Sequence, residues 1–514
     1  MGPIRLFMNV QVMKPENKKE RYGPLVRPIM FVGTCSDAGK SVINTAFCRI
    51  FRQDGYHPAP FKAQNMSLNS FSTPEGGEIG RAQAVQAEAC GLSPHTDMNP
   101  LLLKPTHEKS AQVILNGRPV GNMRAKEYFL SDKRELFEEA VGAFKRLAAR
   151  YNPVVLEGAG SISELNLRER DITNMRMARE VGAATYLVAD IDRGGVFASV
   201  YGSIALLEPA ERKLMRGILV NKFRGDIALF EEGRRILEEL TGIPVVGVIP
   251  YFRDIHIEEE DSVALESKAC RAVGGKINVA VILLRRLSNF TDFDVLERDG
   301  RFHVYYTDDP EEIRKADIVI LPGSKNTIAD MNYIRSKGIA EAILEARKAG
   351  KKIVGICGGY QMMGMRIEDP EGVEGPIQAV PGLGLLPQVT SLTSEKVTRQ
   401  RKFRFQQGGD WCTGYEIHMG KTRLTEGTPE SPLNELEHGG KDGYRLDAHC
   451  WGTYMHGILD NAVVLDELAA GLSERETVGF DYAVFKERQY DLLAERVRAA
   501  VDMEYIYASL TSGG

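Results

Sequence analysis

The chain has 514 residues, of which 43% are hydrophobic and 26% are charged, and its formal net charge at pH 7 is −5. These values are ordinary for a globular protein and exclude a disordered chain. The length predicts two large domains or about three of average size. The acidic balance disfavours a general nucleic-acid binder, although it leaves room for a local basic pocket that binds a small anion.

No stretch of the sequence approaches the ~18 consecutive apolar residues of a membrane span, and no secretory pattern is visible at the N-terminus. The seven cysteines are scattered and include no CxxC pair. This cysteine usage predicts a reduced, cytoplasmic protein without a disulfide framework or a zinc scaffold. No feature of the sequence predicts the oligomeric state.

Residues 1–27 are polar and are expected to be a leader of uncertain order. From 28 to 250, short apolar runs such as IMFVG, PVVLEG and ATYLVAD alternate with segments of helical length, for example 126–150 and 227–240. Such runs are typical of parallel strands buried on both faces. The alternation predicts a doubly wound α/β domain over 28–250. Residues 251–275 are acidic and then glycine-rich, which favours a linker.

A second α/β series begins at Lys276 with INVAVILL, and further apolar runs are FHVYYT, ADIVILPG and KIVGIC. A glycine-rich stretch that is expected to form β-structure follows, up to Tyr454. We therefore expect a second doubly wound domain over 276–468. Residues 469–514 are expected to be a helical tail, with Leu493 and Val497 on its apolar face.

A phosphate-binding loop is predicted directly after the strand IMFV and before a helical run. A glycine-rich loop at a helix N-terminus offers backbone N–H groups to phosphates, while its lysine meets the terminal phosphates and its hydroxyl binds Mg²⁺. Five residues separate the first two motif glycines, where the usual motif has four. This spacing resembles the dethiobiotin-synthetase-like branch of P-loop proteins. The predicted ATP-binding residues of the loop are Gly33, Thr34, Asp37, Gly39, Lys40 and Ser41, with Ser41 also binding the metal.

Three residues at strand ends fit that branch. Lys62 lies where the branch has a second phosphate-facing lysine, Glu157 is a candidate Mg²⁺ ligand, and Asn221 is a candidate adenine contact. Each also has an alternative role in a helix cap or a surface ion pair. Asp190 and Asp192 follow another strand, where they either cap a turn or support the nucleotide or metal.

A nucleophile elbow is predicted around Cys357 in GICGGYQ, after the strand KKIV. Flanking glycines permit a sharp strand-to-helix turn that presents the thiol at a helix N-terminus, where the dipole favours the thiolate. Gly358 offers an oxyanion-stabilising N–H, and Gly323 and Ser324 in LPGSKNT are further candidate donors. His456 in GTYMHG is the candidate base. His418 in GYEIHMG is assigned a structural or substrate-proximal role.

The motifs GICGGYQMMG, LPGSKNT, GYEIHMG and GTYMHG together resemble the cobyrinate-amidating subtype of class I glutamine amidotransferases. GTCSDAGKS, FKAQNMSLNS and VADIDRGGVFAS resemble the ATP-using domain fused to it in that group. The resemblance runs from about Pro28 to at least Asp460. Many class I relatives have a glutamate two residues after the histidine, whereas this chain has Ile458. The resemblance therefore implies a Cys–His dyad and leaves open what orients the imidazole.

The resemblance implies an enzyme that uses ATP, Mg²⁺ and L-glutamine to amidate side chains b, d, e and g of adenosylcobyrinic acid a,c-diamide. Arg81, Lys104 and Arg193 are then candidate cations for the corrinoid carboxylates, near the ATP site. One alternative is the sister activity, cobyrinic acid a,c-diamide synthase. A second alternative, of another class, is a P-loop ATPase switch that binds a partner, but that leaves the cysteine elbow unexplained. Neither nucleic acid nor membrane is an expected partner.

Overall fold

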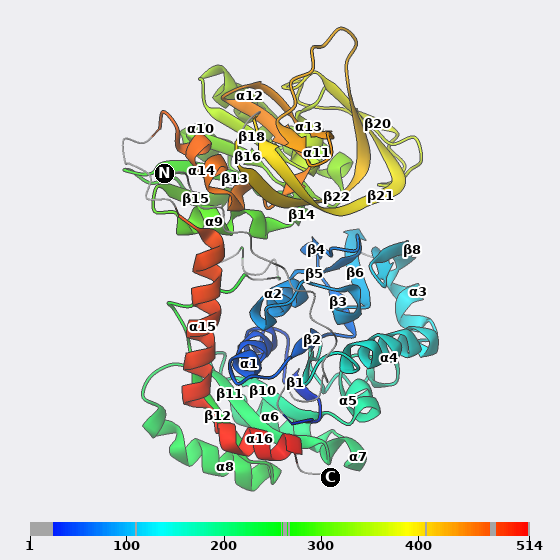
Figure 1. Cartoon of the computed structure of the whole chain (residues 1–514), viewed down its shortest axis with the longest axis vertical. Coiled ribbons are helices and arrows are strands. Elements are labelled where there is room, and N and C mark those ends of the chain that lie inside the picture. The colour runs from blue at the N-terminus through cyan, green and yellow to red at the C-terminus, as the bar shows by residue number, and fades with distance from the viewer. Residues whose placement is uncertain are drawn as a thin grey trace, which may run out of the picture.

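The computed structural model describes residues 24–107, 110–258, 260, 265, 268–406, 409–472 and 480–511. Most of the predicted leader, residues 1–23, lies outside the described residues. Two α/β units are stacked along the long axis of the molecule (Figure 1). We call the unit built on β1–β12 the N-terminal unit and the unit built on β13–β27 the C-terminal unit. The predicted fold class, two α/β domains with parallel sheets, is confirmed.

The N-terminal unit is organised around a six-stranded, fully parallel sheet in the order β12-β11-β10-β1-β9-β2. Its strands are almost wholly buried because helices cover both faces, which explains their continuous apolar runs. The strands are β1 (Ile29–Gly33), β2 (Ala59–Phe61), β9 (Val154–Glu157), β10 (Ala184–Asp190), β11 (Met215–Phe223) and β12 (Val245–Pro250).

The N-terminal unit also carries a smaller sheet and a hairpin toward the C-terminal unit (Figure 1). The smaller sheet has the order β3-β6-β7-β8, and β4 pairs with β5. These strands are β3 (Gln64–Met66), β4 (Ser70–Ser72), β5 (Glu78–Gly80), β6 (Leu101–His107), β7 (Ser110–Leu115) and β8 (Arg118–Arg124). The helices are α1 (Lys40–Gln53), α2 (Arg81–Cys90), α3 (Ala125–Leu130), α4 (Arg134–Ala148), α5 (Met175–Val181), α6 (Val196–Ala205), α7 (Pro209–Arg212) and α8 (Glu231–Thr241).

Two predicted helices differ in detail from the structure. The segment 126–150 is broken between α3 and α4, because Ser131 is extended and Asp132 accepts a hydrogen bond from the backbone N–H of Arg134 at 2.9 Å. The segment 227–240 begins with a short 3-10 turn before α8, where Asp226 caps the N–H of Ala228. In both places a local side-chain cap competes with the continuous helix.

The C-terminal unit combines a mostly parallel sheet with a second, largely antiparallel sheet. The first has the order β15-β13-β16-β18-β26-β25, and only its β25–β26 pair is antiparallel. The second is dominated by the long hairpin of β21 and β22. The strands are β13 (Ile277–Ile282), β14 (Leu287–Ser288), β15 (Phe302–Thr307), β16 (Ile318–Leu321), β17 (Gly323–Ser324), β18 (Lys352–Ile356), β19 (Arg366–Glu368), β20 (Ala379–Pro381), β21 (Gln388–Phe405), β22 (Trp411–Leu424), β23 (Asn434–Leu436), β24 (Lys441–Asp442), β25 (Tyr444–Asp447), β26 (Cys450–Thr453) and β27 (Met455–His456).

Six helices complete the C-terminal unit as the structure describes it. Of these, α13 matters most for function because it begins one residue after Cys357. The helices are α9 (Asp294–Arg298), α10 (Pro310–Lys315), α11 (Thr327–Ser336), α12 (Ile339–Lys348), α13 (Gly358–Met363) and α14 (Ala462–Ala469).

The C-terminal tail returns to the N-terminal unit. Helix α15 (Tyr482–Ala500) runs down the side of the molecule, and α16 (Met503–Thr511) crosses beneath it (Figure 1). Leu493 and Val497 of α15 are fully buried in the same apolar cluster as Phe31 and Phe47. The tail is therefore part of the N-terminal core, although about 230 residues of the other unit separate it from that core in the sequence.

Candidate active sites

The predicted phosphate loop joins β1 to α1 and is held in a turn that needs glycine. Gly39 has φ +91°, and a Cβ there would lie 2.2 Å from Nδ2 of Asn221. That amide nitrogen donates to the carbonyl of Ala38 at 2.9 Å. Asn221 thus supports the loop itself and also lines the cavity beside it, and the adenine contact expected from the sequence stays a prediction. A side chain at position 39 would clash as well as strain the backbone.

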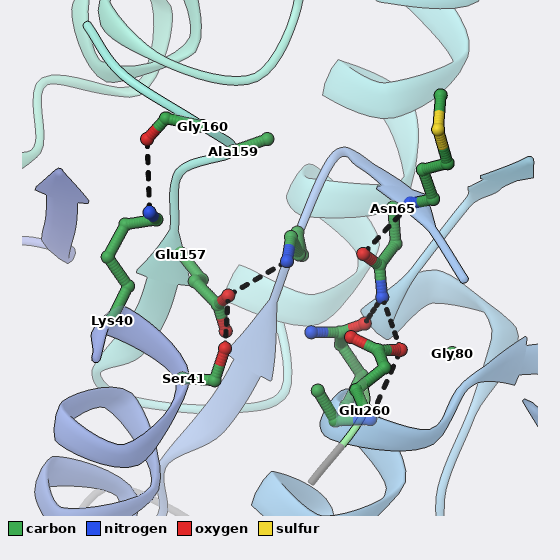
Figure 2. Close-up of polar contacts among 12 residues, drawn as sticks. Lys40, Ser41, Asn65, Gly80, Glu157, Ala159, Gly160 and Glu260 are labelled. Atoms are coloured by element: carbon green, nitrogen blue, oxygen red, sulfur yellow. Dashed lines mark hydrogen bonds and ion pairs between the residues drawn. The ribbon is translucent and has the colours of Figure 1, made fainter. Parts of the chain in front are cut away.

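Glu157 is the centre of the phosphate-loop site. Its carboxylate accepts hydrogen bonds from Ser41 Oγ at 2.8 Å, Lys62 Nζ at 2.8 Å and Gln86 Nε2 at 2.6 Å. Figure 2 shows the carboxylate facing Ser41 beside Lys40. Burial by itself would raise the pKa of Glu157, but Lys62 and the hydrogen bonds outweigh it, so the pKa lies below its usual value. The three predicted residues Ser41, Lys62 and Glu157 meet, and Gln86 joins them.

Lys40 reaches back across its own loop. Its Nζ donates to the carbonyl of Cys35 at 2.9 Å. It also donates to the carbonyl of Gly160 at 3.0 Å (Figure 2). Burial and the nearby charge of Lys62 lower the pKa of Lys40 to about 8. Two cations are therefore held close together beside the loop, an arrangement that a phosphate anion would stabilise.

Asp190, the last residue of β10, and Asp192, which follows it, make different contacts. Asp190 accepts from the backbone N–H of Asp192 at 2.8 Å, so it does shape the turn, and it also pairs with Lys222 at 3.0 Å. Asp192 pairs instead with Arg224 toward solvent. Arg193 lies 3.2 Å from Asp37 of the loop, where it lines the cavity described next.

A cavity of about 1100 Å³ opens beside the phosphate loop. The predicted linker contributes Glu258 and Glu260 to its wall, and Figure 2 shows Glu260 facing Asn65, at 2.7 Å. Five further cations that were not predicted from the sequence also line it: Lys133, Arg168, Arg170, Arg176 and Lys222. These residues could hardly be predicted from the sequence, because only the folding of the loops brings them to the cavity wall.

Two of the expected corrinoid cations lie elsewhere. Arg81 Nε donates to Oε2 of Glu258 at 2.6 Å. Arg81 lines neither of the two cavities. Lys104 of β6 lines a second cavity, whose wall comes from both units. Arg81 is the first residue of α2, whereas Lys104 lies on the small sheet.

The predicted thiol elbow is present at the end of β18. Cys357 has φ +53° and ψ −108°, a conformation rare for a residue with a side chain. Gly358 begins α13, and a Cβ there would lie 2.7 Å from the backbone nitrogen of Ser324. The absence of that Cβ lets α13 approach β17 closely. Cys357 Sγ lies 3.5 Å from the carbonyl oxygen of Ile417.

The imidazole of His456 is oriented by Asp292, which the sequence analysis missed. Asp292 Oδ2 lies 2.7 Å from Nδ1 of His456, and its Oδ1 accepts from the N–H of Gly457 at 2.9 Å. Burial would lower the pKa of His456, but Asp292 and Cys357 outweigh it and raise that pKa to about 10. The expected dyad is thus a Cys–His–Asp arrangement. Its only sequence signal is an acidic residue in SNFTDFD, more than 160 positions before the histidine.

The candidate oxyanion donors converge from two chain segments. Gly323 and Ser324 form β17, which pairs with β14, and the backbone of Ser324 faces Gly358. The Ser324 hydroxyl donates to Asp330 at 2.6 Å, which leaves the role of an oxyanion donor to the backbone. His418 stacks on Tyr454 with 3.8 Å between ring centroids and lines the same cavity as Cys357.

The two cavities share one wall. The thiol cavity, of about 540 Å³, is lined by Cys357 and His456 together with Ser288 and Asn289. The neighbouring Leu287 and Phe290 line the phosphate-loop cavity. Asn289 Oδ1 accepts from the N–H of Ser70 in the N-terminal unit at 3.2 Å. The segment 287–290 therefore contributes to both sites at the junction of the units.

Comparison with known proteins identifies both units. Residues 29–263 match the model of the CobQ/CobB/MinD/ParA nucleotide binding domain, and residues 278–464 match that of the CobB/CobQ-like glutamine amidotransferase domain. None of the helices that the structure describes combines the length and the apolar character needed to cross a membrane.

Full-length relatives carry the same name. A cobyric acid synthase of Parabacteroides distasonis is 70% identical, over 94% of this chain and 99% of the relative. Those of Bacteroides fragilis and Syntrophobacter fumaroxidans are 61% and 48% identical, over 95% and 93% of this chain and 99% and 98% of the relatives. The chain belongs to the cobyric acid synthase family.

Proposed function

We propose that the chain amidates the b, d, e and g carboxylates of adenosylcobyrinic acid a,c-diamide, using ATP and glutamine, to give adenosylcobyric acid. Membership of the family makes the chain a glutamine-dependent amide-forming enzyme of cobalamin biosynthesis. The observation that carries the finer proposal is the pair of cavities, one with a phosphate loop and one with an activated thiol, on either side of one wall. Residues 28–250 would activate the carboxylate and residues 276–468 would supply nitrogen.

In the thiol cavity, Cys357 Sγ attacks the side-chain amide carbon of glutamine. The backbone N–H groups of Gly358 and Ser324, whose chain segments approach closely, would hold the oxyanion of the tetrahedral intermediate. His456, kept protonated by Asp292, gives a proton to the departing ammonia. Water then hydrolyses the glutamyl thioester and regenerates the thiol.

In the phosphate-loop cavity, a substrate carboxylate attacks the terminal phosphorus of ATP, displaces ADP and becomes an acyl phosphate. Ammonia then displaces phosphate, which is a far better leaving group than the oxygen of a free carboxylate. Lys40 and Lys62 neutralise the phosphate charge, and Lys62 is released from Glu157 as it does so. Four of the further cations on the cavity wall suit the acidic side chains of a corrinoid: Lys133, Arg168, Arg170 and Arg176.

The donor set at the loop fits Mg²⁺. Ser41 Oγ and Glu157 Oε1 are hard oxygen ligands 2.8 Å apart. No group of three or more His, Cys, Asp or Glu side chains within the described ranges is arranged for a metal. Mg²⁺ does not require one, since it is usually held by one or two protein oxygens plus substrate phosphates and water. When bound, Mg²⁺ neutralises phosphate charge, and Ser41 and Glu157 would hold it.

The decisive test separates the two nitrogen sources. Cys357→Ala should abolish product formation with glutamine and keep synthesis from concentrated ammonium, since only ammonia release needs the thiol. The exposed Cys270 gives the control Cys270→Ala, which should retain both activities. Mass analysis of the corrinoid product reports how many carboxylates react. If cobyrinic acid is converted only to its a,c-diamide and the a,c-diamide is not amidated further, the sister activity is supported. Glutamine use by Cys357→Ala would refute the assignment of the thiol.

A further inference from the structure

The thiol cavity contains a concentration of positive charge that the mechanism above does not use. Lys104, Lys325 and Lys396 all line it. Lys325 follows the oxyanion strand β17, and Lys396 lies on β21. Lys104 comes from β6 of the N-terminal unit, and its side chain is only 4% exposed.

Glu78 of β5 is the one carboxylate that pairs directly with this lysine cluster in the described structure. Its side chain is fully buried and accepts from Lys104 at 2.7 Å and also from Lys396. Those cations outweigh the opposing effect of burial and hold the pKa of Glu78 far below its usual range. Lys325 and Lys396 share a weaker acceptor, the side-chain oxygen of Gln112, at 3.1 and 3.3 Å.

The cluster therefore has an excess of buried positive charge. Burial, with Lys396 and Lys104 nearby, lowers the pKa of Lys325 to about 7. A bound anion would favour the charged form of Lys325 and offset the repulsion among the three lysines. The same cavity also contains two carboxylates, Glu371 and Glu374. Glu374 accepts from the N–H of Ile328 at 2.9 Å, and burial raises its pKa to about 7.

Glutamine has the shape and charge to use this arrangement. Its amide must lie at Cys357, and three methylene and methine carbons separate that amide from a zwitterionic head that carries one carboxylate and one ammonium. Cys357 and Lys396 line the same cavity, of about 540 Å³. Anionic and cationic groups at the far end of the ligand would thus meet lysines and glutamates of the same cavity.

We propose that Lys104, Lys325 and Lys396 form the subsite for the α-carboxylate of glutamine, and that the N-terminal unit completes it. This inference rests on the proposed glutaminase function. Glu78 and Gln112 position the lysines, and both belong to the N-terminal unit, as does Lys104 itself. Glutamine binding in the C-terminal unit thereby depends on the docking of the unit that consumes the ammonia.

The test compares glutamine with L-glutamine α-amide, in which an uncharged amide replaces the α-carboxylate. For wild type, the ratio of kcat/KM for glutamine to kcat/KM for the α-amide should be about 10 to 100, because the α-amide lacks a hydrogen-bonded charge. In Lys325→Met and Lys104→Met this ratio should fall toward one, mainly through a raised KM for glutamine. Lys325→Arg keeps the charge and should keep the ratio.

A matched control is Lys421→Met on β22, whose lysine is 66% exposed and pairs with Glu395. It should leave the ratio unchanged. Ammonium-dependent synthesis in every variant reports that the protein is folded. An unchanged ratio in folded Lys325→Met would overturn the carboxylate subsite, and an unchanged ratio in Lys104→Met alone would overturn its completion by the N-terminal unit. Failure of wild type to hydrolyse glutamine would instead refute the proposed function.

Discussion

Lys40 and Cys357 occupy matching places in the two units, each where a buried parallel strand gives way to a helix. Their surroundings differ. The phosphate-loop site is a network in which Glu157, Ser41 and Lys62 already satisfy one another, so a nucleotide must compete with bonds within the protein. The thiol site is set in advance by a strained backbone and by the Asp292–His456 pair.

The chain therefore prepares its two proposed reactions in different ways. Phosphate binding can rearrange flexible cations, because the charge arrives with the ligand. Attack on an amide needs the nucleophile, the proton donor and the oxyanion donors in place beforehand.

The largest effect is expected from Lys40→Ala, which should abolish amidation with glutamine and with ammonium alike. Activation of the carboxylate precedes any use of nitrogen, and Lys40 is the loop cation. The measurements are product formation with each nitrogen source and, in a separate assay, glutamine hydrolysis. Cys357→Ala is the reciprocal control. Normal ammonium-dependent synthesis by Lys40→Ala would remove the loop from the reaction.

Asp292→Asn should reduce the kcat of glutamine hydrolysis by about 100-fold or more while sparing ammonium-dependent synthesis. The wild-type profile should fall on its alkaline side near the pKa of His456, about 10, because the imidazolium is then lost. Without the charge of Asp292, that pKa drops, so the alkaline limb should move to lower pH. A pH–rate profile of both proteins checks this, and an unmoved limb would contradict the role given to Asp292.

Glu157→Gln should lower turnover with either nitrogen source by about 10- to 100-fold and retain much of the nucleotide affinity. The substitution keeps the shape of the side chain and removes the charge that would hold Mg²⁺. Nucleotide binding and turnover over a Mg²⁺ titration are the measurements. Wild-type turnover at limiting Mg²⁺ would exclude Glu157 from the site.

The smallest effect tests the tail. Leu493→Ala should destabilise the N-terminal unit by about 2–4 kcal/mol, because it leaves a cavity among fully buried side chains. Val484→Ala on the same helix, where Val484 is 45% exposed, should change stability by less than about 1 kcal/mol. Denaturant unfolding measures both. Equal stability of the two variants would show that α15 is not part of that core.

Local chemistry in the sequence determined both reaction centres. Strand, glycine-rich turn and helix specify the phosphate loop and the thiol elbow, since backbone conformation there depends on neighbouring residues. The buried strands were also predictable, because burial on both faces requires continuous apolar runs. Glu157 and His456 could be predicted as site residues because each stands at the end of a strand within a specific motif.

Tertiary structure alone decided what surrounds these centres. Asp292 reaches His456, Lys104 reaches the thiol cavity, and α15 returns to the N-terminal core, each across a large gap in sequence. Any carboxylate could orient an imidazole and any lysine could face either cavity, so residue type by itself does not select among them. Long-range packing makes that selection, because only the folded chain determines which side chains are close enough to exchange a hydrogen bond.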